Sequence, residues 1–250
     1  MEFLNTAQGR SIAYEQLPGV GLGVLPGVVF AGGFRSDMTG TKAQYLREWA
    51  QARGRAFTRF DYSGHGASGG RFEEGAIGDW LQDALAVLAL TTGPQILVGS
   101  SMGGWIALLI ARAMPDRVAG LVTVAAAPDF TEDSIWAGLD FATKARLLTD
   151  GMIYLPSDYG DPFAITLRLI DEGRGQLVLR SPLSLPMPVR MLQGTADMDV
   201  DQQVALRLLD HATGPDVRLT LVKGADHRFS TPDCLALLGA TLDEITARVG

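Results

Sequence analysis

The sequence predicts an α/β domain built on a mostly parallel, doubly wound sheet. Short apolar runs that end in glycine alternate with segments of helical spacing along most of the chain. Such alternation is typical of parallel strands joined by crossover helices. The 250 residues, 47% of them hydrophobic, suit one domain with a buried core. We therefore expect one domain over residues 1–250, with a cap inserted at about 128–182.

A β-hairpin opens the predicted fold, and strands then alternate with helices. The segments FLNT and SIAYEQL flank Gln8-Gly9-Arg10, a typical turn sequence. Gly54 follows the first predicted helix and Pro115 follows the third, as these residue types commonly do at helix ends. We expect strands at 27–33, 56–60, 95–99 and 118–127, and helices at 41–54, 77–90 and 104–114.

The alternation breaks between residues 128 and 182 and then resumes. Beyond the break we expect strands at 188–194 and 216–224, and helices at 201–212 and 234–249. The break itself mixes apolar residues with turns, which indicates an insertion on one side of the sheet. Its apolar side chains could line an acyl pocket or pack against the body of the domain. The candidates for substrate contact are Trp136, Phe141, Ile153 and Tyr154.

Composition excludes several classes of function. A net charge of −7 without any basic run argues against nucleic acid as a partner. The single cysteine, Cys234, excludes an intrachain disulfide and a multi-cysteine metal site, and no cluster of metal ligands is evident. No apolar stretch is long enough for a membrane span, and the N-terminus lacks the pattern of a secretory signal. We expect a cytoplasmic protein without cofactor or metal.

The segment Gly99-Ser100-Ser101-Met102-Gly103 lies between a predicted strand and a predicted helix. It fits the pattern G-x-S-x-G with Ser101 at the centre. A nucleophile on so tight a turn needs small residues two positions before and after it. Centring the turn on Ser100 would place Val98 and Met102 there, and both are too large. Ser101 is therefore the candidate nucleophile, and the alternative is a glycine-rich helix start that only packs or binds phosphate.

A serine nucleophile needs a base, and the chain offers three histidines. His211 lies near the end of a predicted helix, where a solvent-facing role is expected. His65 lies in DYSGHGASGG, whose glycines indicate a structural turn beside the site. His227 follows the last predicted strand, which is the position expected of a base that acts on Ser101.

The acid that orients the base should lie between Ser101 and His227 in the sequence, after a late strand. Asp197 follows the strand at 188–194 by three residues, and Asp199 competes with it. Asp201 is expected to cap the next helix. Asp226 adjoins His227 in the chain and is poorly placed to reach the imidazole ring from behind. We favour Asp197 over Asp199.

An oxyanion hole needs two backbone N–H groups directed at the developing charge. Met102, the residue after the nucleophile, would supply one of them. The loop after the first central strand, AGGFRSD, would supply the other from Phe34, because Gly32 and Gly33 permit a close approach. An ordinary glycine turn is the alternative for this loop.

The order Ser101, Asp197, His227, together with the Gly32-Gly33-Phe34 loop, resembles the α/β-hydrolase family over essentially the whole chain. A closer resemblance is to the mitochondrial palmitoyl-protein thioesterase and acyl-glucuronide esterase group of abhydrolase-domain proteins. The segments that carry it are GFRSDMTGTKA, RFDYSGHGASGG, GPQILVGSSMGGW and Asp226-His227-Arg228. The resemblance implies a cofactor-free hydrolase of carboxylic esters or thioesters with a small cap. The cap matches less well than the core, so the reaction class transfers better than the substrate.

The functional hypothesis is two-step acyl transfer through an acyl-enzyme on Ser101. A carbon–carbon or amide hydrolase with the same triad is the alternative enzyme. Dehalogenase or epoxide hydrolase chemistry is disfavoured, because those members of the family generally carry Asp where Ser101 stands. A ligand-binding protein without catalysis is a remote alternative, since no triad member is missing.

Overall fold

The computed structural model describes residues 1–20, 25–157 and 160–249. Within these residues eight strands form the main sheet, in the order β1-β2-β4-β3-β5-β6-β10-β12. The pairs β1–β2 and β2–β4 are antiparallel, and the other neighbours are parallel, which confirms the predicted sheet. The strands are β1 (Glu2–Asn5), β2 (Ser11–Leu17), β3 (Val28–Ala31), β4 (Phe57–Phe60), β5 (Gln95–Ser100), β6 (Val118–Val124), β10 (Val189–Gly194) and β12 (Val217–Val222).

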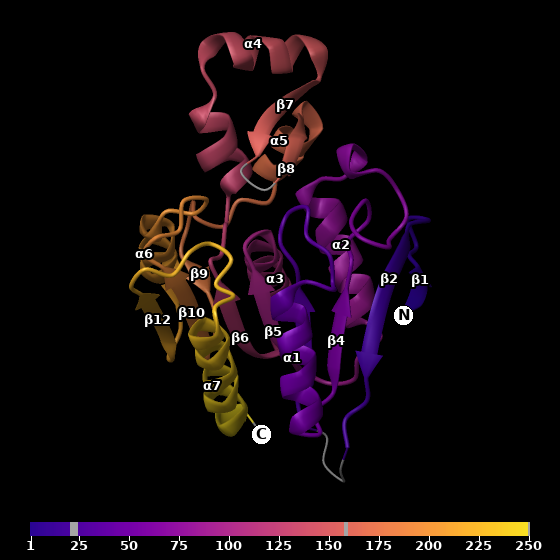
Figure 1. The fold of residues 1–250 in the computed structure, drawn as a ribbon, viewed down its shortest axis with the longest axis vertical. Helices are drawn as coiled ribbons and strands as arrows, with labels where there is room; N and C mark the ends of the chain where they lie inside the picture. The colour runs from indigo at the N-terminus through magenta and orange to yellow at the C-terminus, as the bar shows by residue number, and fades with distance from the viewer. Residues whose placement is uncertain (21–24, 158–159, 250) are drawn as a thin grey trace.

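Helices cover both faces of this sheet (Figure 1). Helices α1 (Thr41–Ala52) and α7 (Pro232–Val249) share one hydrophobic cluster with Val28 and Phe30 of β3. Helices α2 (Ile77–Leu88), α3 (Met102–Ala113) and α6 (Gln202–His211) share the other cluster with Val29 and Ala31. Successive side chains of a strand point to opposite faces, so β3 must be apolar throughout, and all four of its residues are buried.

A cap layer lies above the C-terminal ends of the parallel strands, at the top of Figure 1. It contains a π-helix, η3 (Thr131–Trp136), helix α4 (Phe141–Asp150), the antiparallel pair β7 (Met152–Ser157) and β8 (Gly160–Thr166), and helix α5 (Leu167–Arg174). The side chains of Asp140 and Thr166 accept backbone N–H groups of Thr143 and Leu169, which explains where α4 and α5 begin.

One buried carboxylate joins the two ends of the cap. Asp129 accepts hydrogen bonds from the backbone N–H groups of Val178, at 2.8 Å, and Leu179, at 2.9 Å. It also accepts one from the Arg180 guanidinium at 3.1 Å. Its φ of 59° lies in the left-handed region, which Asp tolerates better than most residues. We call these contacts the Asp129 clamp, because they tie the start of the cap to its end.

Short elements complete the fold. They are the 3₁₀ turns η1 (Phe72–Glu74) and η2 (Pro115–Arg117), and the parallel pair β9 (Leu183–Ser184) and β11 (Ala212–Thr213). Among the helices that the structure describes, none has the length and hydropathy to cross a membrane.

Candidate active site

A cavity of about 570 Å³ lies between the cap and the C-terminal ends of the central strands. Its walls come from the loops after β3, β5, β10 and β12 and from the cap. In parallel sheets this edge commonly holds the ligand, because the loops that end neighbouring strands converge there. The lining residues are Gly33, Phe34, Arg35, Ser36, Lys42, Ser100, Ser101, Met102, Ala127, Phe130, Ser134, Ile135, Phe163, Asp199, Val200, His227 and Arg228.

Ser101 lies on the turn between β5 and α3 in a strained backbone conformation, with φ 55° and ψ −120°. Close packing forces this turn to carry glycine on both sides. A Cβ atom on Gly99 would lie 2.3 Å from the carbonyl oxygen of Gly103, and one on Gly103 would lie 2.1 Å from that of Ala31. The steric requirement read from G-x-S-x-G is thus visible in the backbone, and it places Ser101 at the helix N-terminus.

His227 lies in the loop between β12 and α7 and faces Ser101. Its Nε2 is 3.1 Å from Ser101 Oγ, and its Nδ1 is 2.9 Å from Asp197 Oδ2 and 3.1 Å from Oδ1. The carboxylate favours the tautomer with the proton on Nδ1, because only that nitrogen can then donate to it. Nε2 is left to accept the hydroxyl proton of Ser101.

Asp197 follows β10 and is held from several directions. Besides His227, it accepts the backbone N–H groups of Asp199 at 2.9 Å and Val200 at 2.8 Å, and the Gln193 amide at 2.9 Å. Burial opposes ionisation of Asp197, but the hydrogen bonds from His227 and Val200 outweigh it and keep its pKa below the ordinary value. The carboxylate therefore stays ionised through the neutral range.

The competing acids have other positions. Asp199 is exposed, and its backbone N–H donates to Asp197. Asp226 accepts the backbone N–H of Phe229 at 3.0 Å and so shapes the His227 loop. Asp201 caps α6 by accepting the backbone N–H of Gln203 at 2.7 Å, as predicted.

Metal binding is the other chemistry that this cluster could suggest, because ligand atoms of Asp197, Asp199 and His227 lie within 4.8 Å of one another. The donor set does not suit it. Both oxygens of Asp197 already accept hydrogen bonds, and both ring nitrogens of His227 have partners. Their arrangement fits proton transfer to and from Ser101 instead.

The predicted oxyanion-hole residues border the same cavity as Ser101. Met102 is the first residue of α3, so its N–H belongs to a helix N-terminus, where anions are favoured. Phe34 follows Gly33, and a Cβ on Gly33 would lie 3.3 Å from Ser101 Cβ, so this loop packs directly on Ser101. The Phe34 ring is held edge-on by Phe72, at a centroid distance of 4.9 Å, and by Phe130, at 5.4 Å.

Asp61 anchors that loop, and sequence reasoning did not single it out. Its carboxylate accepts the backbone N–H groups of Met38 at 2.6 Å and Ala67 at 2.8 Å, and so joins the Phe34 loop to the DYSGHGASGG loop. A Cβ on Gly66, whose φ is +47°, would lie 2.1 Å from Asp61 Oδ2. The glycines of this motif were the available signal, because they mark a loop wrapped closely around a buried group.

The other two histidines lie apart from Ser101. His65 is buried, with Nδ1 3.1 Å from the carbonyl oxygen of Ser63 and its ring edge-on to Trp80 at 5.1 Å. Burial is the main cause that lowers its pKa. His211 ends α6, with Nδ1 3.0 Å from the carbonyl oxygen of Arg207.

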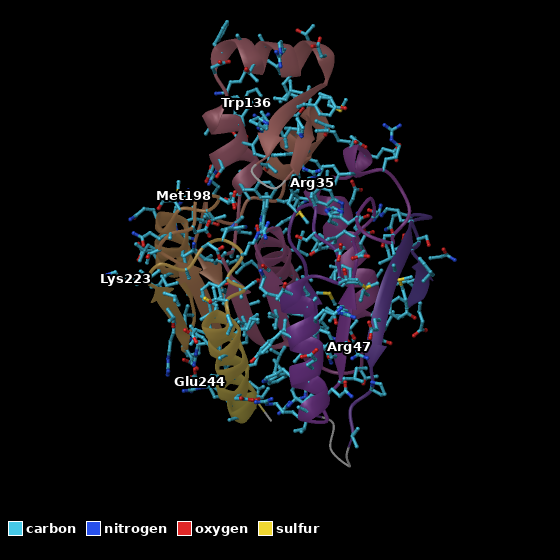
Figure 2. The ribbon with its side chains drawn as sticks, in the orientation of Figure 1. Arg35, Arg47, Trp136, Met198, Lys223 and Glu244 are labelled. Atoms are coloured by element: carbon cyan, nitrogen blue, oxygen red, sulfur yellow. The ribbon has the colours of Figure 1, made fainter. Side chains whose placement is uncertain are left out.

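The cap residues predicted for substrate contact do not line the cavity. Ile153 is buried in the core. Trp136 lies in the cap (Figure 2). The cations of Lys144 and Arg174 lie over its ring, 5.4 Å and 4.9 Å from the ring centroid. Phe141 and Tyr154 are exposed. The cap presents Phe130, Ser134, Ile135 and Phe163 to the cavity instead. Hydrophobicity alone could not distinguish these positions, because it does not say which face of each cap element meets the cavity. At Trp136 the π-helix also departs from ordinary helical spacing.

Lys42 is a further cavity residue that the sequence did not reveal. Its ammonium group donates to the carbonyl oxygen of Arg228, the residue after His227. Burial lowers its pKa to about 8, although Asp226 and Asp197 favour the charged form. Arg35 and Arg228 also border the cavity, and Arg35 lies between the cap and the body in Figure 2.

Comparison with known proteins finds a hydrolase family model and thioesterases that are similar to this chain. Residues 27–152 match the family model Hydrolase_4, described as "Serine aminopeptidase, S33". The palmitoyl-protein thioesterase ABHD10 of Mus musculus is 38% identical over 98% of this chain and 82% of its own length, and that of Homo sapiens is 36% identical over 98% and 79%.

Solved structures extend the likeness to the fold. A putative hydrolase from Agrobacterium vitis S4 is 40% identical with a TM-score of 0.94, covering 98% of both chains. The mouse α/β-hydrolase domain-containing protein 10 is 37% identical with a TM-score of 0.91, covering 100% of this chain and 99% of its own. The chain therefore belongs to the α/β-hydrolase family and is a homologue, over almost its whole length, of the ABHD10 thioesterases.

Proposed function

We propose that the protein is a serine hydrolase that cleaves carboxylic esters or acyl thioesters through an acyl-enzyme on Ser101. The observation that carries the proposal is the hydrogen-bonded chain from Ser101 Oγ to His227 Nε2, at 3.1 Å, and from His227 Nδ1 to Asp197, at 2.9 Å. Ser101 and His227 line a cavity of about 570 Å³. The relatives named palmitoyl-protein thioesterases support the same bond type.

In the first step His227 accepts the hydroxyl proton of Ser101 while Oγ attacks the carbonyl carbon. Asp197 keeps the imidazole in its productive tautomer and stabilises the imidazolium that forms. The N–H groups of Phe34 and Met102 stabilise the oxyanion, and loss of one such donor typically costs about 10²–10³ in kcat. His227 then protonates the leaving oxygen or sulfur.

In the second step water replaces the leaving group beside His227. The imidazole accepts a proton from that water as its oxygen attacks the acyl-enzyme carbonyl, and the same two N–H groups stabilise the second oxyanion. Collapse of this intermediate returns the proton to Ser101 Oγ and releases the carboxylic acid. His227 thus acts as the base in both halves of the reaction.

A substrate panel tests the proposal. The purified chain is assayed with p-nitrophenyl esters, acyl thioesters and acyl amides that share the same acyl groups. We expect turnover of esters or thioesters at least about 10²-fold faster than that of the amides, since amides have the poorer leaving group. Preferential amide cleavage would favour a peptidase, as the description of the family model suggests. Negligible rates across all three series would contradict esterase function.

A further inference from the structure

Lys42 links helix α1 to the loop that carries His227. It lies in the first turn of α1, a few residues after Phe34, and it lines the active-site cavity. Its Nζ donates to the carbonyl oxygen of Arg228, the residue that follows His227. Through this side chain, the segment proposed to bind the oxyanion contacts the segment that holds the base.

The position of Lys42 opposes its charge in two ways. A cation in the first turn of a helix lies at the positive end of the helix dipole, and α1 has no acidic residue in that turn. The side chain is also half-buried, and burial lowers its pKa to about 8. The Arg228 carbonyl oxygen and the nearby carboxylates of Asp226 and Asp197 favour the charged form. The ammonium group is therefore stabilised mainly by its contacts around His227.

The charged and titratable groups around Lys42 come from several segments. Asp226 and Arg228 lie in the His227 loop, Asp197 follows β10, and Cys234 lies in the first turn of α7. Arg35, Asp199 and His227 border the same cavity. The two carboxylates nearest in charge, those of Asp226 and Asp197, favour the ammonium form, whereas the Arg228 guanidinium disfavours it. This balance lets Lys42 lose its proton within a range of pH in which the protein can be assayed.

Helix α1 gives the Lys42 side chain a fixed origin. The next residue, Ala43, is buried, and so is Leu46 one turn further on. The helix packs against α7 on the same face of the sheet (Figure 1). A Cβ on Gly239 of α7 would lie 2.4 Å from the Tyr45 hydroxyl oxygen, so the two helices approach closely. A donor on a helix held in this way can define the position of the carbonyl that it binds.

The His227 loop, between β12 and α7, is anchored on both sides of the base. Before His227, the Ala225 carbonyl oxygen accepts the backbone N–H of Ala196 at 3.0 Å. After it, the Phe229 side chain is fully buried in the hydrophobic cluster that α1 and α7 share. The ends of the loop are thus fixed, and the orientation of the peptides between them depends on further contacts.

Two donors meet at the carbonyl oxygen between these anchors. The Arg228 oxygen accepts Lys42 Nζ from α1 and Ser230 Oγ, at 2.8 Å, from the loop itself. The Lys42 donor is charged, and charged donors make the stronger hydrogen bonds. Lys42 therefore contributes most to holding the peptide that follows His227.

We propose that Lys42 is a positioning residue, which holds the Arg228 carbonyl and so keeps the His227 imidazole within reach of Ser101. The distance that depends on it is the 3.1 Å between His227 Nε2 and Ser101 Oγ. A displacement of about 1 Å in such a contact can cost about 10²-fold in rate. This inference rests on the proposed function and adds a group that serves the reaction through another residue.

Substitution of Lys42 is the first test, with kcat and KM measured on p-nitrophenyl acetate. Lys42→Met keeps an unbranched side chain without the donor, and it should lower kcat by about ten- to 10²-fold with KM changed less than about threefold. Lys42→Arg restores a charged donor and should recover kcat to within about fivefold of wild type. Rates are expressed per Ser101 that a fluorophosphonate labels, so that unfolded protein does not count.

Lys223→Met is the matched control. Lys223 directly follows β12, at the start of the loop that carries His227, and its side chain is exposed (Figure 2). The substitution removes the same charge from the neighbourhood of the loop without removing a donor to the Arg228 carbonyl. It should leave kcat within about twofold of wild type.

The pH dependence of kcat separates a charged donor from a side chain that only fills space. The pKa of Lys42 is about 8, so the ammonium group and its stronger hydrogen bond are lost above that pH. Wild-type kcat should fall about three- to tenfold between pH 7 and 9.5. Lys42→Arg should keep its kcat over the same range, because the guanidinium stays charged. This comparison remains decisive where Lys42→Met folds poorly.

Ser230→Ala tests whether Lys42 acts through the Arg228 carbonyl. Since two donors share that oxygen, loss of one should matter more when the other is absent. Ser230→Ala should therefore lower kcat at least about threefold more in Lys42→Met than in wild type. Additive effects of the two substitutions would mean that Lys42 acts at another place, and would overturn the proposal.

Three further results would overturn it. They are an unchanged kcat per labelled Ser101 in Lys42→Met, a change confined to KM, and the same fall of kcat at high pH in wild type and Lys42→Arg. Failure of the proposed function looks different, because wild type would then hydrolyse no ester or thioester. The rate of fluorophosphonate labelling at Ser101 would still report on the position of His227, and Lys42→Met should slow it.

Discussion

The C-terminal edge of the parallel strands, here called the sheet edge, and the cap differ in how closely their side chains are held. At the sheet edge, backbone geometry and hydrogen bonds restrain the groups closely: Ser101 has a positive φ, and Asp197 accepts hydrogen bonds from His227, Gln193 and two backbone N–H groups. The cap leaves large apolar side chains in solvent, with Phe141 89% and Tyr154 60% exposed. Under the proposed function, the restrained groups are those that make and break bonds, and the cap is the part that meets the substrate. The proposal thus assigns reaction class and substrate choice to different parts of the chain.

The largest predicted effect is at the sheet edge. Ser101→Ala should lower kcat/KM for ester substrates by about 10⁴- to 10⁶-fold, because it removes the nucleophile and leaves only binding and the oxyanion hole. The matched control is Ser100→Ala, the neighbouring hydroxyl, which should retain activity within about tenfold. Steady-state assays on p-nitrophenyl acetate measure both. Loss in Ser100→Ala with retention in Ser101→Ala would reverse the assignment.

The next effect concerns the base and its tautomer. Asp197→Asn should lower kcat by about 10³- to 10⁴-fold, because an amide can donate to Nδ1 and so fix the unproductive tautomer. Asp199→Asn is the control of equal size and charge, and it should change kcat by less than about tenfold. Both are compared at saturating ester. Equal losses in the two variants would mean that position near His227, and not the hydrogen bond, determines the rate.

In the cap, the predicted effect is on the free energy of unfolding. Asp129→Ala should lower the free energy of unfolding by about 1–3 kcal/mol, because two buried backbone N–H groups lose their acceptor. Alanine at a φ of 59° adds strain. Asp133→Ala removes only exposed ion pairs with Arg180 and Arg207 and should cost under about 1 kcal/mol. Denaturant unfolding compares them, and similar losses would argue against the Asp129 clamp.

The last predicted effect is a pH dependence of stability that arises from Lys42, which lines the cavity. Its pKa in the folded protein is about 8, below the value of 10.5 for a free lysine, because burial disfavours the charge. The resulting penalty is fully present below pH 8 and is relieved as pH rises from 8 toward 10.5. The Tm of wild type should therefore rise relative to that of Lys42→Met across this window. A constant difference between the two proteins from pH 7 to 10 would show that Lys42 does not titrate as described.

Sequence patterns predicted the body of this molecule better than the cap. Parallel strands and their crossover helices have strong periodicity, so β3, β5 and α3 could be placed to within a few residues. The Gly99–Gly103 turn could be predicted because the tight backbone around Ser101 admits few residue types. Asp61, Lys42 and the lining of the cavity depend on which loops meet in space, and that information is not local in the sequence.

Prediction from the sequence was least accurate for the side chains of the cap. Apolar residues at helical spacing indicated Trp136 and Phe141 as substrate contacts, yet one packs among cations and the other faces solvent. Whether such a side chain is buried or exposed depends on which other elements of the fold pack against it. The π-helix at Thr131–Trp136 also breaks the 3.6-residue period on which the prediction rested.

Identification of the residue that carries the covalent intermediate tests the central claim most directly. The wild-type protein is treated with a fluorophosphonate, digested and examined by peptide mass spectrometry, so that the modified residue is assigned by fragmentation. We expect one adduct, on Ser101, and its loss on prior incubation with a slowly hydrolysed ester. An adduct on Ser100, or a folded protein that forms none, would contradict it.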